Sequence, residues 1–78
     1  MTKKVSFNQA KKVLCEFARK QGEKMPKYQV EANVRFFNRV LTWVEEGVCG
    51  SWSWPDAMTT FKKEGDMCVV DGPVAKFF

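Results

Sequence analysis

Apolar residues recur every three or four positions near the start of the chain, which is the spacing of one helix face. Ser6 and Gln9 form a capping-box pattern before this stretch, and Gly22 is placed to end it. We therefore predict a first helix over residues 7–21. Its apolar stripe consists of Phe7, Ala10, Val13, Leu14, Phe17 and Ala18.

A second, longer helical pattern starts after Pro26, which suits a first helical turn, and stops before Gly47. We predict a helix over residues 28–46. Phe36 and Trp43 lie beside its main seam, so the apolar sector spans roughly 200°, more than one partner helix covers. Something else must therefore cover Phe36 and Trp43. The seam itself consists of Val30, Val34, Phe37, Val40, Leu41 and Val44.

The next stretch changes character, because Trp52 and Trp54 alternate with serines as they would in an extended segment. A helix-capping pattern then begins at Ser53, and Pro55 suits the first turn that follows. We predict a short third helix over residues 54–64. Its apolar face would contain Trp54, Ala57, Met58 and Phe61.

Two short apolar stretches close the chain. Residues 67–70 and 73–78 flank the turn-forming pair Asp71 and Gly72, which predicts two short strands. Pro73 has no backbone N–H to donate, so the second strand is expected to be an edge strand or an irregular one.

Together these elements predict a mainly α fold. Three helices, at about 7–21, 28–46 and 54–64, precede a small C-terminal β-hairpin or extended tail. Residues 1–78 are expected to form a single small domain, because a chain this short cannot support two cores. The apolar content of 45%, with seven Phe and three Trp, predicts that the chain folds.

The net charge of +4 conceals an asymmetry. Residues 1–39 carry ten Lys and Arg against three Glu, a net +7, whereas residues 40–78 carry three Lys against six acidic residues, a net −3. A basic half attracts polyanions or acidic protein surfaces. The chain shows no signal-peptide pattern and no apolar run of about 18 residues, so we expect no membrane segment.

The usual parts of an active site are missing. There is no histidine, no glycine-rich phosphate loop and no nucleophile with a recognisable base beside it. Cys15, Cys49 and Cys68 are odd in number and lack any Cys-x-x-Cys pair, so neither a disulfide framework nor a zinc site is expected. We predict a cytoplasmic protein with reduced thiols that is not an enzyme and needs no cofactor or metal.

Aromatic residues are the first candidate for function. Phe36, Trp43, Trp52 and Trp54 either cover the core or form a protein-binding patch, and a homodimer through Phe36 and Trp43 would satisfy the same pattern. We predict a non-catalytic protein that binds another protein as a regulator or inhibitor. Small basic proteins of this kind are common among the accessory products of bacterial viruses.

Basic residues on the first two predicted helices are the alternative. If those helices pack antiparallel, their exposed faces could form one positive surface that contacts phosphates without reading base sequence. Nucleic acid is therefore a possible partner, although solvated faces of small helical proteins are often rich in lysine. The residues concerned are Lys11, Lys12, Arg19, Lys20, Arg35 and Arg39.

Overall fold

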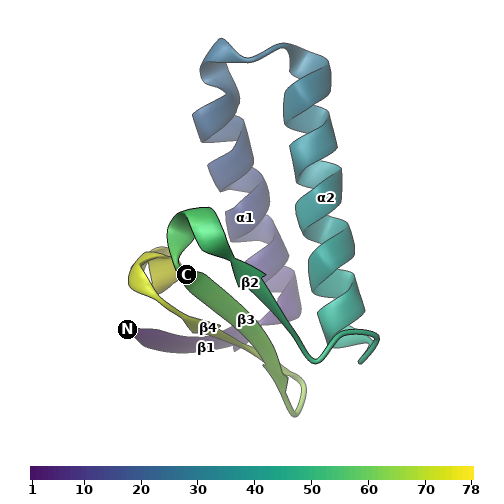
Figure 1. Ribbon diagram of the computed structural model, residues 1–78, viewed down its shortest axis with the longest axis vertical. Helices are drawn as coiled ribbons and strands as arrows, with labels where there is room; N and C mark the ends of the chain where they lie inside the picture. Colours follow the sequence, from purple (N-terminus) through teal and green to yellow (C-terminus); the bar gives the residue numbers. More distant parts are fainter.

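Two antiparallel helices lie on one face of a four-stranded antiparallel sheet in the computed structural model, which describes residues 1–78 (Figure 1). The strand order is β1-β4-β3-β2. Short 3₁₀ segments occur at Gly22–Lys24, Pro55–Ala57 and Pro73–Phe77. The main elements are β1 (Thr2–Ser6), α1 (Phe7–Gln21), α2 (Lys27–Glu45), β2 (Ser51–Trp54), β3 (Thr59–Glu64) and β4 (Met67–Asp71).

The fold is therefore α+β, and the predicted mainly α, three-helix fold is wrong. Of the predicted third helix at residues 54–64, only a single 3₁₀ turn forms, and Met58 ends it in the left-handed conformation at φ 51°. The rest of that stretch is β3, in which Thr59 and Phe61 are buried and the residues between and after them are not. Threonine and phenylalanine favour strands. A short apolar pattern fits both the helical spacing and the alternation of a strand, so pairing with β2 and β4 decides between them.

The predicted C-terminal hairpin is also wrong. β4 lies between β1 and β3 and pairs with both, for example Cys68 with Val5 and with Lys63. The residues after Gly72 form a 3₁₀ segment in place of a second strand. The real hairpin is β3–β4, whose two-residue loop begins with Gly65 at φ 62°, a conformation that glycine adopts without strain.

Both long helices lie where the pattern predicts them. α1 has the predicted bounds, and its N-terminus is capped by Ser6, whose Oγ accepts a hydrogen bond from the Gln9 backbone N–H at 3.0 Å. α2 begins and ends one residue earlier than predicted, directly after Pro26. Local capping and apolar spacing are therefore sufficient to locate this helical hairpin.

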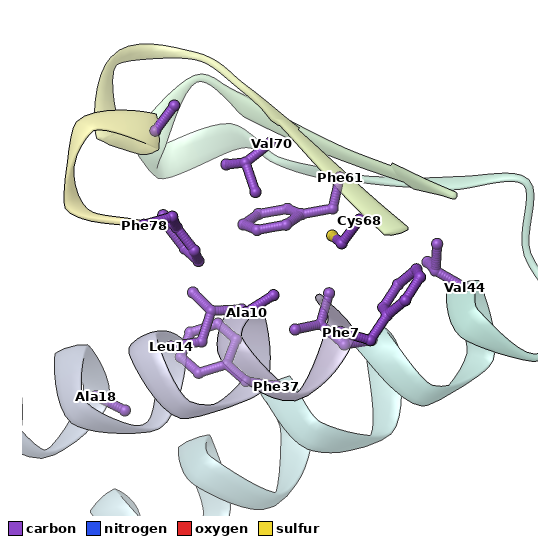
Figure 2. Packing of buried hydrophobic residues seen from close by; sticks show 12 residues of the cluster. Phe7, Ala10, Leu14, Ala18, Phe37, Val44, Phe61, Cys68, Val70 and Phe78 are labelled. Carbon is purple, nitrogen blue, oxygen red and sulfur yellow. The ribbon is translucent and has the colours of Figure 1, made fainter. Parts of the chain in front are cut away.

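The core lies between the helical hairpin and the inner face of the sheet. Phe61 and Val70 point from the sheet towards α1, and the ring of Phe78 closes one end, with its centroid 5.6 Å from that of Phe61 (Figure 2). The main helical members of this cluster are Phe7, Ala10, Leu14, Ala18, Phe37, Leu41 and Val44.

The helical hairpin is longer than the sheet that it covers. α1 packs on β1 and β4, whereas α2 packs on β3 and β2. The ends of the helices joined by Gly22–Lys24 extend beyond the edge strand β2 (Figure 1). The sheet-facing side of this hairpin tip is therefore only partly covered by the chain.

Candidate functional site: an aromatic groove

An open pocket of about 530 Å³ lies between the overhanging half of the helical hairpin and β2 with the following 3₁₀ turn. Nine of its 13 lining residues are hydrophobic. We call this pocket the aromatic groove. Its large apolar side chains are Phe17 from α1, Phe36 and Phe37 from α2, Met25 from the loop between the helices, and Trp52 and Trp54 from β2.

The alternation of serine and tryptophan in β2 positions two indoles at the groove. Successive side chains of a strand point to opposite faces, so Ser51 and Ser53 face solvent while both tryptophans face the helices. The Trp54 ring meets Phe17 edge-on at a centroid distance of 5.3 Å. The two indoles stack at 6.2 Å with an interplanar angle of 13°. The strand therefore presents one continuous aromatic surface.

Phe36 and Phe37 of α2 extend that surface, because their rings contact the two tryptophans. Phe37 is buried and lies 5.3 Å from Trp54 and 5.9 Å from Trp52, measured between ring centroids. Phe36 contacts Trp52 edge-on at 6.0 Å but leaves 53% of its surface exposed. Phe37 thus anchors the cluster in the core, whereas Phe36 forms an accessible wall of the groove.

Few polar groups line the aromatic groove. Gln21 and Asn33 contribute amide groups from the two helices, and Asp56 is the only ionisable lining residue. The lining has no general base beside a nucleophile and no set of metal-ligating side chains. Its chemistry suits the burial of an apolar group, with a few hydrogen bonds at the rim.

Three of the four aromatic residues predicted to bind protein meet in the aromatic groove. These are Phe36, Trp52 and Trp54. Trp43 does not line it and contacts no other aromatic ring; it lies about two turns further along the same side of α2, 42% exposed. The structure therefore separates Trp43 from the other three.

Phe17, Phe37 and Met25 were not expected at the site. The apolar spacing of the helices assigned Phe17 and Phe37 to core seams; Phe37 does belong to the core cluster, whereas Phe17 is half-buried beside the groove. The Ser-Trp-Ser-Trp alternation was the signal that could have located the groove. Two inward-facing tryptophans on one short strand need large apolar neighbours to cover them.

The six basic residues of the alternative prediction lie in different environments. Arg19 and Arg35 line a shallow groove on the outer side of the hairpin, whereas Lys20 borders a different hollow beside Phe17. Lys11 is paired with Glu45 at 2.9 Å and joins α1 to α2. Lys12 and Arg39 are exposed. Of the six, Lys11 alone belongs to an ion pair.

The cysteines are free thiols with different environments. Cys15 and Cys68 are buried and Cys49 is half-buried. Burial raises the pKa of the Cys68 thiol to about 11, because the charged thiolate would lose its hydration in the core. Cys68 therefore acts as an apolar core residue at neutral pH.

No helix of this chain combines the length and the apolar character needed to cross a membrane. No family model, curated protein or solved structure matches the chain. The function proposed for it therefore depends on the chemistry of the aromatic groove and of the surfaces around it.

Proposed function

We propose that this protein is a non-catalytic module that binds another protein through the aromatic groove and so regulates or inhibits it. The observation that carries the proposal is the open pocket in which Phe36, Trp52 and Trp54 meet. Tryptophan and other aromatic residues at the centre of a pocket are typical anchors of protein interfaces.

The arrangement of the groove supports binding with little reorganisation. Trp52 stacks on Phe61 and Trp54 contacts Phe37, so the floor is held in place by two core residues. A partner side chain would meet a surface that is already ordered, which lowers the entropic cost of association. Phe36 is exposed enough to cover an incoming apolar group.

We further propose that the protein acts in the cytoplasm. All three cysteines are unpaired in the fold, and none belongs to a cluster of metal-ligating residues. Thiols of this kind persist in a reducing compartment, whereas small secreted domains depend on disulfides.

The proposal is tested by affinity capture from a lysate of the source cells after nuclease treatment, comparing the wild type with Phe36→Ala. The exposure of Phe36 makes this substitution mild for the fold, which circular dichroism checks. Proteins retained by the wild type should be lost from Phe36→Ala, because the substitution removes one wall of the groove.

The control carries Arg35→Gln and Arg39→Gln, two exposed basic residues of α2 that do not line the aromatic groove. We expect this double variant to retain the same proteins as the wild type. Loss of binding only in the double variant, or retention seen only when the nuclease is omitted, would reject the aromatic groove in favour of nucleic-acid binding by the basic residues.

A further inference from the structure

β2 is a free edge of the sheet. It pairs only with β3, and no backbone hydrogen bond outside the strand ladders involves Ser51–Trp54. Every second N–H and C=O of an edge strand points away from the sheet. β2 therefore offers unused donors and acceptors to another extended chain.

The two edges of the sheet differ in their protection. The opposite edge, β1, carries Lys3 and Lys4, and exposed lysines on an edge strand oppose pairing with a further strand. β2 has the sequence Ser-Trp-Ser-Trp, with no charge, and Pro55 follows only after its last residue. Of the two edges, β2 is the one that accepts a neighbour.

The aromatic groove lies directly beyond this edge. Trp52 and Trp54 of β2 form one side of it, and the overhanging helices form the other through Phe17, Phe36 and Met25. A fifth strand placed at the usual spacing of about 4.8 Å from β2 would point every second side chain towards the helices. Those side chains would enter the groove.

The charge around the groove selects the chemistry of such a strand. Residues 19–27, at the tip of the hairpin, carry four basic residues and Glu23, a net +3, and Asp56 in the groove lining lowers the sum to +2. The Phe17–Trp54 contact places the Trp54 end of β2 about one helical turn from Lys20, which lines a hollow together with Phe17, inside a Debye length of about 10 Å. The four basic residues are Arg19, Lys20, Lys24 and Lys27. All of them are exposed, and none belongs to an ion pair.

We propose that an extended segment of the partner protein adds to β2 as a fifth strand. Its apolar side chains occupy alternate positions and fill the aromatic groove, and acidic residues occupy the end beside Trp54. This inference rests on the proposed function, since it specifies the partner of the same groove. It follows the general mode in which backbone hydrogen bonds give affinity and side-chain pockets give specificity.

The first experiment selects binders to the full-length protein from a displayed library of random short peptides. Enriched sequences should have apolar residues at every second position and Asp or Glu at one end. Synthetic copies of the best peptide are then N-methylated one residue at a time. Methylation at alternate residues, whose N–H groups would face β2, should weaken binding about tenfold or more, while methylation at the others should have little effect.

The second experiment follows the protein by hydrogen–deuterium exchange and by affinity for the same peptide. The outward-facing amides of Ser51–Trp54 should become protected when the peptide binds. Lys20→Glu with Lys24→Glu should weaken binding several-fold at low salt. Lys62→Glu, on the outer face of the sheet, is the control and should leave the affinity nearly unchanged.

The outcomes separate this inference from the function on which it rests. Strand addition is overturned if the peptides lose affinity for Phe36→Ala but carry apolar residues at helical spacing. It is also overturned if the effect of N-methylation does not alternate along the peptide. Either result leaves the groove as a protein-binding site. If no peptide is enriched, strand addition is rejected, and the capture experiment with Phe36→Ala decides the proposed function. If the peptides bind Phe36→Ala as tightly as the wild type, both are rejected. The inference is also overturned if the protein sediments as a dimer and its β2 amides are protected from exchange without peptide. That result would assign the edge to a second copy of the chain.

Discussion

The indole of Trp52 stacks on the ring of Phe61 at a centroid distance of 5.3 Å and an interplanar angle of 25°. The two residues are direct cross-strand partners in the β2–β3 ladder, and Phe61 is fully buried. This pair connects the floor of the aromatic groove to the centre of the core. The shape of the groove therefore depends on the same packing that stabilises the fold.

Trp52→Ala should lower the free energy of unfolding by about 2–3 kcal/mol, less than a fully buried aromatic residue would cost, because Trp52 is half-buried. The lost contacts are those with Phe61, Phe37 and Phe36. Denaturation with urea measures the change. Trp43→Ala is the control and should cost less than about 1 kcal/mol, because its side chain is exposed and contacts no other ring. Equal losses in the two variants would contradict the role given to Trp52.

Gly72→Ala should destabilise the protein by about 2–4 kcal/mol. Gly72 has φ 149°, and a Cβ there would lie 2.6 Å from the Met58 carbonyl oxygen and 2.7 Å from the Thr59 Cα, both backbone atoms. Gly47→Ala is the matched control: φ is also positive, at 79°, but no atom lies within 4 Å of the added Cβ. It should cost only about 1–2 kcal/mol, the backbone strain alone. A thermal or urea transition that moves equally in both variants would reject the steric argument.

Ser6→Ala should cost about 1 kcal/mol, because the Gln9 backbone N–H at the start of α1 loses its acceptor. Ser53→Ala, on the exposed face of β2, should change stability by no more than about 0.5 kcal/mol. Equilibrium denaturation of both variants gives the comparison. A larger effect at Ser53 than at Ser6 would be incompatible with the capping contact.

Alkaline pH should destabilise the protein partly through Cys68. Its pKa rises from 9.0 to about 11 in the fold, so between these values the unfolded chain loses a proton that the folded chain keeps. The free energy of unfolding therefore falls as pH rises through this window, and the contribution is intact below pH 9.0. Cys68→Ala lacks this thiol and leaves the rest of the chain unchanged. The stability advantage of the wild type over Cys68→Ala should shrink across the window; an advantage that stays constant would show that the thiol is not desolvated.

The local sequence determined the two long helices. Ser6, Gly22 and Pro26 act on the backbone groups next to them, and the apolar stripes of α1 and α2 need no knowledge of distant residues. The excess of aromatic residues on α2 and β2 was also evident from sequence, and of the four residues it indicated, Phe36, Trp52 and Trp54 meet in the groove, whereas Trp43 does not. These features depend on contacts that are short in sequence.

Tertiary structure alone decided the sheet and the site. Thr59–Glu64 became a strand because β2 and β4 lie on either side of it, and Thr2–Ser6 became a strand because Met67–Asp71, more than sixty residues away, supplies its hydrogen bonds. The aromatic groove exists because the hairpin of α1 and α2 extends past the edge of that sheet. Strand pairing and overhang are relationships between distant segments, and no local spacing along the chain encodes them.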